Sequence, residues 1–169
     1  MFGLDPARFE REVRDEKLRA IARGTGLNLK METFQPLVPA SYPIDGFLLG
    51  HRIRVVGSSP RDADRFHINL RADNEIAFHF NPRFSQNCVV RNSFQDGKWN
   101  FGMEERVGGM PLERQKMFTI DLIEMGGFIR MVVNGKNFAQ YVERMDSKKI
   151  KRIEIDGDIE VHSVQVYTL

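Results

Sequence analysis

Residues 79–106 read HFNPRFSQNCVVRNSFQDGKWNFGMEER, and the rest of the chain is organised around this stretch. From residue 76 onward, apolar and polar side chains alternate with a period of two, which predicts a half-buried β-strand. The apolar members of the alternation, Ile76, Phe78 and Phe80, are therefore expected to enter a core between β-sheets.

His79, Asn81 and Arg83 occupy the intervening positions of this strand. Side chains two residues apart share one face of a strand, so we expect the three polar groups to form a row on the water-facing side. Pro82 has no backbone N–H to donate, and the strand is therefore expected to end or to lie at a sheet edge there.

A second polar group follows along the chain. The run from Val89 predicts a second strand that carries Asn92, and Asp96-Gly97 is a turn dipeptide. Trp99, the only tryptophan, comes next, followed by Glu104. A single indole among such polar groups is typical of a sugar-binding site, because the ring offers a flat apolar platform while the polar groups bond hydroxyls at its edge.

These residues resemble the galectin family of β-galactoside-binding lectins. His79-Phe80-Asn81-Pro82-Arg83-Phe84, then Val90, Asn92, Trp99 and Glu104-x-Arg106, follow the family's signature in order. An ordered motif of this length is a specific signal, and the resemblance extends over roughly residues 32–169. The chain departs from the pattern once, because the family usually places its Glu three residues after the Trp and Glu104 lies five after it. A two-residue insertion between Asn100 and Met103 explains the difference.

The resemblance implies a lectin that binds terminal β-galactosides such as lactose or N-acetyllactosamine. It implies these carbohydrate-binding residues: His79, Asn81, Arg83, Asn92, Trp99, Glu104 and Arg106. The first three are assigned to the axial 4-hydroxyl of galactose and Trp99 to the apolar ring face. Asn92 is assigned to the 6-hydroxyl, and Glu104, aimed by Arg106, to the 6-hydroxyl and the neighbouring sugar. All of these contacts are made by side chains, so no cofactor or metal is expected.

The insertion leaves an alternative open. A strand rises about 3.3 Å per residue, so two extra residues would carry Glu104 roughly 6–7 Å away unless they loop out. We expect a longer loop between Trp99 and Glu104, with Glu104 restored to its place. The alternative is a galectin-fold protein-interaction module in which the inserted loop has altered or abolished sugar binding.

Outside the motif, short β-like runs predict an all-β, antiparallel two-sheet sandwich, which the resemblance sharpens to a jelly roll. The runs are residues 47–57, 66–71, 118–123, 128–133, 138–142, 150–155 and 159–167. Residues 66–71 are expected to form a hairpin with the motif strand. That pairing would place the polar row of His67, Asn69 and Arg71 beside His79 on the same face.

Residues 1–31 form a predicted N-terminal extension before a carbohydrate-recognition domain of residues 32–169. Asp5 suits the N-cap of a helix and Pro6 its first position, while Gly24 and Gly26 supply its end. The apolar stripe of Phe9 and its neighbours is thin. Three roles remain open for the extension: a partner-binding arm, a contact with the sandwich, or a solvated helix that is partly frayed.

The composition and the charge distribution exclude several classes of function. The chain has 169 residues, of which 41% are hydrophobic and 28% are charged, as in an ordinary globular protein. Seven basic and five acidic side chains in residues 1–31 account for the whole formal charge of +2, so the remainder lacks the basic face of a nucleic-acid-binding protein. Four scattered histidines lack zinc spacing. Glu104 and Glu105 are adjacent and should point to opposite faces, unlike the paired carboxylates of a glycosidase. We expect a protein that is not an enzyme.

The expected location and partners follow from the same observations. No apolar run approaches the length of a membrane span, and Cys88 is the only cysteine, so cytosolic synthesis without membrane insertion is expected. Galectins leave cells without a signal peptide, so the resemblance leaves extracellular action open. It also implies glycoproteins and glycolipids as partners, and a homodimer through the sheet edges that residues 1–31 could block or replace.

Overall fold

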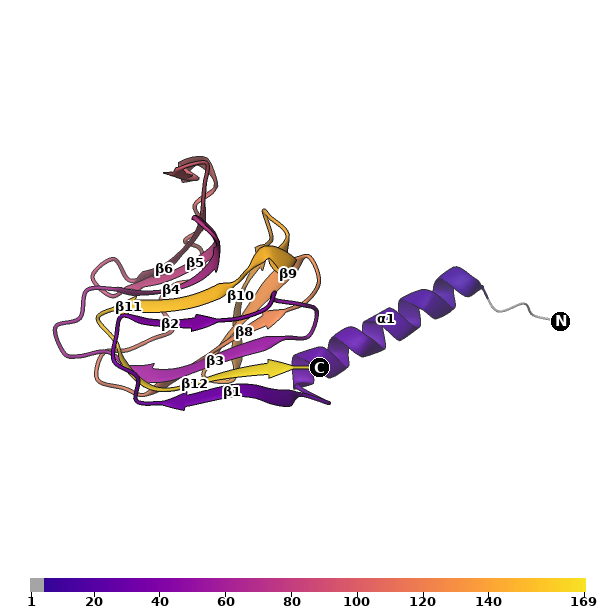
Figure 1. The fold of residues 1–169 in the computed structure, drawn as a ribbon, viewed down its shortest axis with the longest axis horizontal. Coiled ribbons are helices and arrows are strands. Elements are labelled where there is room, and N and C mark those ends of the chain that lie inside the picture. Colours follow the sequence, from indigo (N-terminus) through magenta and orange to yellow (C-terminus); the bar gives the residue numbers. More distant parts are fainter. Residues whose placement is uncertain (1–4) are drawn as a thin grey trace.

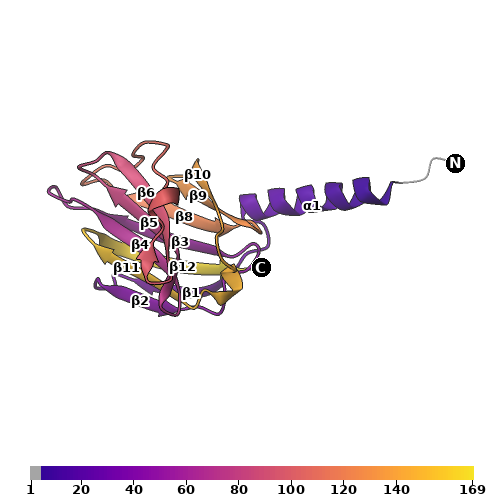
Figure 2. The same ribbon diagram turned by 90° about the horizontal axis from the view of Figure 1, so that it is seen from above.

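The fold is an antiparallel β-sandwich with one helix, seen in a computed structural model that describes residues 5–169, apart from the side chains of Arg8 and Phe9. Residues 1–4 of the predicted extension lie outside the described residues. Twelve strands form two six-stranded sheets, ordered β1-β12-β3-β8-β9-β10 and β2-β11-β4-β5-β6-β7 (Figures 1 and 2). The strands are β1 (Asn28–Phe34), β2 (Ala40–Pro43), β3 (Arg52–Ser58), β4 (Phe66–Ala72), β5 (Glu75–Arg83), β6 (Cys88–Gln95), β7 (Lys98–Trp99), β8 (Phe118–Glu124), β9 (Phe128–Val133), β10 (Lys136–Val142), β11 (Arg152–Gly157) and β12 (Glu160–Thr168).

The core lies between the two sheets and confirms the predicted orientation of the motif strand for two of its three apolar residues. Phe78 and Phe80 of β5 are fully buried in the main cluster of core side chains. Across the core, the rings of Phe66 and Phe118 stack with centroids 5.6 Å apart, joining β4 of one sheet to β8 of the other. Burial of these large rings is the main contribution that holds the sheets together.

Ile76 does not enter this core, contrary to the prediction. The pairing between β4 and β5 shifts between Ile76 and Phe78, so that Ile76 faces Arg71 while Ala77 has no partner on β4 and forms a bulge. A bulge adds one residue to one strand and so turns the preceding side chain to the other face. Ile76 is buried on the polar-row face instead, where it also opposes Phe94 of β6.

Pro82 does not end its strand, and β5 is an inner strand of its sheet. Pro82 pairs with Val89 of β6. On the β4 side, the regular pairing stops at Phe80 and resumes only as an isolated bridge at Arg83. Proline is tolerated here because its missing donor coincides with a gap in the ladder.

The strand predicted for residues 47–57 starts later than expected, at Arg52. Residues before it form a turn, in which the backbone N–H of His51 donates to the carbonyl of Leu48 at 2.9 Å. Gly50 has a φ of 83°, and a Cβ there would lie 2.3 Å from the side chain of Leu169. The apolar run therefore reflects the burial of Phe47 in the core rather than a continuous strand.

The predicted N-terminal helix is present as α1 (Pro6–Arg23), with Asp5 as N-cap and Gly24 as C-cap. Most of it projects away from the sandwich, and Val13 is 50% exposed (Figure 1). Its last turn is docked, because Ile21 packs on Ile123 and Met125. No helix among residues 5–169 is long and apolar enough to cross a membrane.

The join between α1 and the sandwich is also polar. Arg52 donates to the carbonyl of Ala22 at 3.1 Å, and its guanidinium lies 3.8 Å from the carboxylate of Asp121. A cation at the carboxyl end of a helix interacts favourably with the helix dipole. β1 then starts at Asn28 and pairs with β12, so residues 28–31, which the boundary at residue 32 placed in the extension, belong to the sheet.

The buried carboxyl group of Glu124 on β8 should make the stability of the fold depend on pH. Burial, followed by the neighbouring carboxyl of Glu143, raises the pKa of Glu124 to about 9. This folded-state pKa lies above that of an unfolded glutamate. The stabilisation that the protonated Glu124 contributes to the folded state is therefore fully present below about pH 4.5 and is lost as the pH rises toward 9. We expect the wild type to lose stability between pH 5 and pH 8.5 in urea titrations, and Glu124→Gln to lose less. Equal losses in the two proteins would contradict this.

Candidate functional site

The predicted polar rows come together on the outer face of β4, β5 and β6. The pairing places Asn69 beside His79 and His79 beside Asn92, while Asn81 pairs with Val90. A hollow of about 280 Å³ lies over these strands. Its lining residues are Arg65, His67, His79, Asn81, Arg83, Val90, Asn92, Trp99, Phe101 and Glu104. Six of the seven predicted site residues therefore border one hollow, and the seventh, Arg106, is bonded to Glu104.

His79 is oriented by the neighbouring strand. Its Nδ1 lies 2.5 Å from Oδ1 of Asn69. An amide oxygen can only accept, so Nδ1 carries the proton and Nε2 is the acceptor nitrogen. Burial, followed by the nearby His67, lowers the pKa of His79 to about 3. The imidazole is thus neutral at physiological pH and can accept a hydrogen bond from a ligand hydroxyl.

This pKa leads to a prediction about the pH dependence of ligand binding. The folded-state pKa of His79 lies below the ordinary 6.5, so the neutral form persists as the pH falls until about pH 3. If His79 accepts from the ligand, affinity measured by titration calorimetry should change less than about twofold between pH 7.5 and pH 5. A loss of affinity with a midpoint near pH 6.5, abolished in His79→Gln, would show that this imidazole titrates normally.

Asn81 and Arg83 are bonded to each other. The side-chain amide of Asn81 donates to the backbone carbonyl of Phe66 at 2.7 Å, and its oxygen accepts from Nε of Arg83 at 2.8 Å. Using Nε in this way fixes the plane of the guanidinium and leaves its terminal nitrogens as donors at the hollow. One of them has a long contact of 3.3 Å with Gln86. The row thus combines an acceptor at His79 with donors at Arg83.

Asn92 is held by Arg144, a residue to which the sequence reasoning gave no role. The side-chain oxygen of Asn92 accepts from the backbone N–H of Ser93 and from Nη1 of Arg144, each at 2.8 Å. With both lone pairs occupied, the amide presents its NH₂ group as a donor to a ligand. Arg144 is 52 residues away in the chain, and no local pattern pointed to it.

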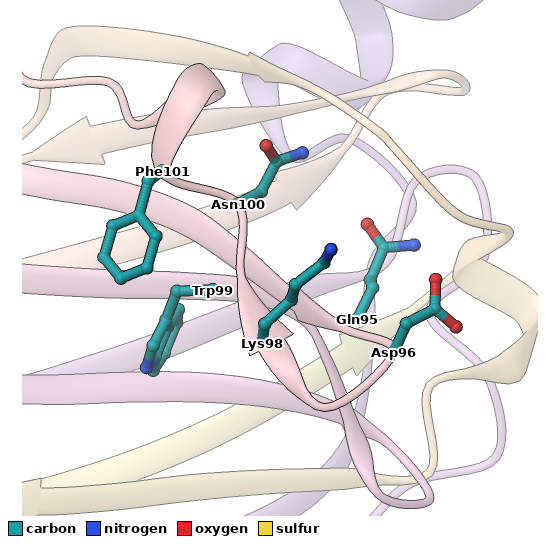
Figure 3. A pocket seen from close by; sticks show the side chains of 6 residues that line it. All are labelled: Gln95, Asp96, Lys98, Trp99, Asn100 and Phe101. Carbon is teal, nitrogen blue, oxygen red and sulfur yellow. The ribbon is translucent and has the colours of Figure 1, made fainter.

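Trp99 forms the side wall of the hollow. It pairs with Phe94, whose ring meets the indole edge-on with centroids 5.3 Å apart, and the centroid of His79 lies 4.6 Å away. These contacts on the sheet side hold the indole, which remains half-buried and borders the hollow. A second hollow of about 420 Å³ adjoins the same segment, and Figure 3 shows the side chains that line it. It is lined by Gln95, Asp96, Lys98, Trp99, Asn100 and Phe101.

The expected loop between Trp99 and Glu104 is a short 3₁₀ turn, η1 (Phe101–Met103). After it the chain returns to the sheet, because Glu105 and Arg91 exchange two backbone hydrogen bonds of 2.9 Å. The turn absorbs the extra residues, and Glu104 borders the hollow. Nε of Arg106 donates to its carboxylate at 2.8 Å, as expected from the sequence.

The donor and acceptor set suits a neutral, hydroxyl-rich ligand. Among residues 5–169, no group of three or more His, Cys, Asp and Glu side chains could hold a metal ion. The described lining of the hollow contains a single carboxylate, Glu104, while Glu105 points to Arg144. An aromatic wall with two imidazoles, two amides and two guanidinium groups around it can bind the apolar face and the hydroxyls of a sugar at the same time.

Comparisons with known proteins agree with this geometry. The family model described as galactoside-binding lectin matches residues 40–166. The 32 kDa beta-galactoside-binding lectin of Haemonchus contortus is 36% identical over 76% of this chain, and the match spans 44% of that lectin. Galectin-7 of Rattus norvegicus is 36% identical over 72% of this chain and 91% of its own length. The crystal structure of Caenorhabditis elegans galectin LEC-6 superposes with a TM-score of 0.76 at 41% identity, covering 80% of this chain and 94% of that one.

Proposed function

The chain belongs to the galectin family of galactoside-binding lectins, and on that premise we propose that it binds terminal β-galactosides such as lactose and N-acetyllactosamine without altering them. One observation carries the proposal. His79, Asn81, Arg83, Asn92, Trp99 and Glu104 border a single hollow whose size suits one sugar residue with part of a second. The galectin family consists of lectins rather than enzymes, which agrees with the single carboxylate of the hollow.

The family resemblance assigns a role to each of these residues, and the hydrogen-bonding groups described above are compatible with the assignment. The axial 4-hydroxyl of galactose would donate to Nε2 of His79 and accept from Arg83, because these groups lie in one row with opposite hydrogen-bonding character. The continuous C–H face of the same ring would lie against Trp99. The NH₂ group of Asn92 would donate to the 6-hydroxyl. Glu104, held by Arg106, would accept from the 6-hydroxyl and the next sugar.

Retention on immobilised lactose tests the proposal directly. We expect the protein to bind the column, to elute with free lactose and to remain bound in the same concentration of sucrose. Turnover of a chromogenic β-galactoside should be absent while the same compound competes for the column. Passage through the column without retention would favour the alternative, a galectin-fold interaction module whose insertion has removed sugar binding.

Glu104 provides a test of the insertion itself. Changing Glu104→Gln keeps the size of the side chain but removes the charge, so the ion pair with Arg106 and one acceptor for the ligand are lost together. A charge-assisted hydrogen bond contributes about 1.5–3 kcal/mol, so affinity for lactose should fall by roughly tenfold or more. Glu113→Gln, which removes the charge of an exposed glutamate paired with Lys116 outside the hollow, is the matched control in titration calorimetry. Parent-like affinity of the Glu104 variant would mean that the insertion has displaced this carboxylate from the ligand.

The proposal extends to the partners of the protein and to its location in the cell. The ligands would be galactosides displayed on glycoproteins and glycolipids. Synthesis in the cytosol, export without a signal peptide and a homodimer through the sheet edges stay predictions. Because a single shallow site binds weakly, clustering of glycans would need more than one site per particle. Sedimentation velocity of the full chain would measure the oligomeric state, and subcellular fractionation together with assay of the medium would measure the location.

A further inference from the structure

Helix α1 presents an exposed face on which acidic and basic side chains are separated along its length. Four charged residues share this face, because they are spaced by four, three and four positions. They are Glu12 and Glu16 toward the amino end and Arg19 and Arg23 toward the carboxyl end, and all four are exposed. Together with Asp15 they line a hollow of about 390 Å³ along the helix. These four residues are called the charged face of α1.

The helix by itself does not explain this distribution of charge. Glu12 and Glu16 stand four residues apart, as do Arg19 and Arg23, and like charges at this spacing destabilise a single helix. The helix dipole acts on the first and last turns, and of the four residues only Arg23 lies in one of them. The sandwich does not cover the face either, because only the last turn of α1 is docked. A second molecule is therefore needed to set opposite charges against both like-charged pairs.

The complementary surface exists on a second copy of the same helix. When two identical helices pair antiparallel, the acidic end of each charged face meets the basic end of the other. Glu12 then lies opposite the partner's Arg23, and Glu16 lies opposite the partner's Arg19. Both pairs have the same midpoint, between residues 17 and 18, so a single register forms them together. Twofold symmetry repeats each pair on the other side of the axis.

The shape of the molecule leaves room for this pairing. A helix of 18 residues is ~27 Å long, and most of α1 projects away from the sandwich (Figures 1 and 2). An antiparallel partner would lie along α1 with its own sandwich at the far end, so the two sandwiches would not collide. Val13, which is 50% exposed, follows Glu12 at the border of the charged face and would be covered in the pair. Its burial adds an apolar contribution to the ion pairs.

We propose that α1 is a dimerisation helix, whose charged face pairs antiparallel with α1 of a second copy of this chain. The contact is small and mostly polar, and exposed ion pairs contribute little each, so the dimer is weak, with a dissociation constant on the order of 100 μM. The pairing does not depend on sugar binding. If the proposed function holds, the dimer also gives each particle two galactoside sites and therefore avidity for clustered glycans.

Sedimentation velocity of the full chain tests the proposal, at protein concentrations on both sides of this dissociation constant. The wild type should shift from monomer to dimer as its concentration rises. Because salt screens exposed ion pairs, the dissociation constant should rise by about fivefold or more between about 0.05 M and about 0.5 M salt.

Reversing the charges tests the pairing residue by residue. Glu12→Lys with Glu16→Lys makes the face wholly basic, and Arg19→Glu with Arg23→Glu makes it wholly acidic. Each double variant alone should stay monomeric at concentrations at which the wild type is a dimer, because like charges then face each other. An equimolar mixture of the two double variants should form a heterodimer at least as stable as the wild-type dimer, since opposite charges meet again.

A matched control carries the same change of charge on the opposite side of α1. Arg11→Glu with Arg14→Glu reverses two exposed arginines outside the charged face, and this variant should dimerise like the wild type. Circular dichroism checks that every variant keeps the helix.

The outcomes separate this inference from the proposed function. A wild type that stays monomeric at every concentration would overturn the inference. So would a dimer that both charge reversals leave intact, which would move the contact to another surface such as the sheet edges, or a control as monomeric as the reversals. A mixture of the reversed variants that stays monomeric would overturn the antiparallel pairing. If the wild type dimerises as expected but is not retained on immobilised lactose, the proposed function fails and the dimer stands.

Discussion

Trp99→Ala should lower the affinity for lactose by about two orders of magnitude. The indole face and the C–H face of galactose would together remove ~100 Å² of apolar surface from water, which at about 25 cal/mol per Å² is ~2.5 kcal/mol, and each 1.4 kcal/mol is a tenfold change in affinity. Phe94 and His79 hold the indole in place, so the protein does not have to order it when the sugar binds. Titration calorimetry against lactose gives the affinities directly.

Two controls accompany the Trp99 variant. Trp99→Phe keeps an aromatic face of smaller area and should lose distinctly less affinity than Trp99→Ala. Because Trp99 lies on the short edge strand β7 and is only half-buried, its removal should lower the melting temperature little. Lactose affinity of the alanine variant equal to that of the parent would show that the sugar does not stack on this ring.

Exchanging lactose for cellobiose should weaken binding by roughly thirtyfold or more. The two disaccharides differ only in the configuration at C4 of the terminal sugar, so ring size, linkage and second sugar are unchanged. With an equatorial 4-hydroxyl, Nε2 of His79 and the donors of Arg83 lose their partner. Each buried group left unpaired costs about 1–3 kcal/mol, which for two groups is roughly a thirtyfold loss or more.

The lactose and cellobiose comparison is repeated with the variant His79→Ala. The variant lacks one of the two groups that read the 4-hydroxyl, so lactose should bind more weakly and the difference between lactose and cellobiose should shrink. His67→Ala is the matched control, because His67 also borders the hollow but is assigned no contact with the 4-hydroxyl. Equal competition by lactose and cellobiose for the immobilised galactoside would contradict the assignment of the polar row.

The amino-acid sequence by itself determined the sandwich, the hairpin of β4 and β5, and the row formed by His79, Asn81 and Arg83. These features depend on neighbours two residues apart, and a period of two places alternate side chains on opposite faces whatever the rest of the chain does. Helix capping is also local, so Asp5 and Pro6 located the start of α1 to the residue, and Gly24 with Gly26 located its end to within two residues.

Only the tertiary structure decided the features that depend on pairing between distant segments. The bulge at Ala77 moved Ile76 to the other face, because register is set by both strands of a pair and not by one. Arg144 reached Asn92 across 52 residues, and burial under neighbouring strands made His79 a neutral acceptor. The insertion was visible in the sequence as two extra residues between Trp99 and Glu104. Phe101 borders the hollow because of the way the inserted turn is bonded to Arg144, and the sequence did not predict that bond. The spacing of residues along the chain therefore predicted the fold and the residues of the site. The packing of distant segments determined how the hydrogen-bonding groups of those residues are oriented.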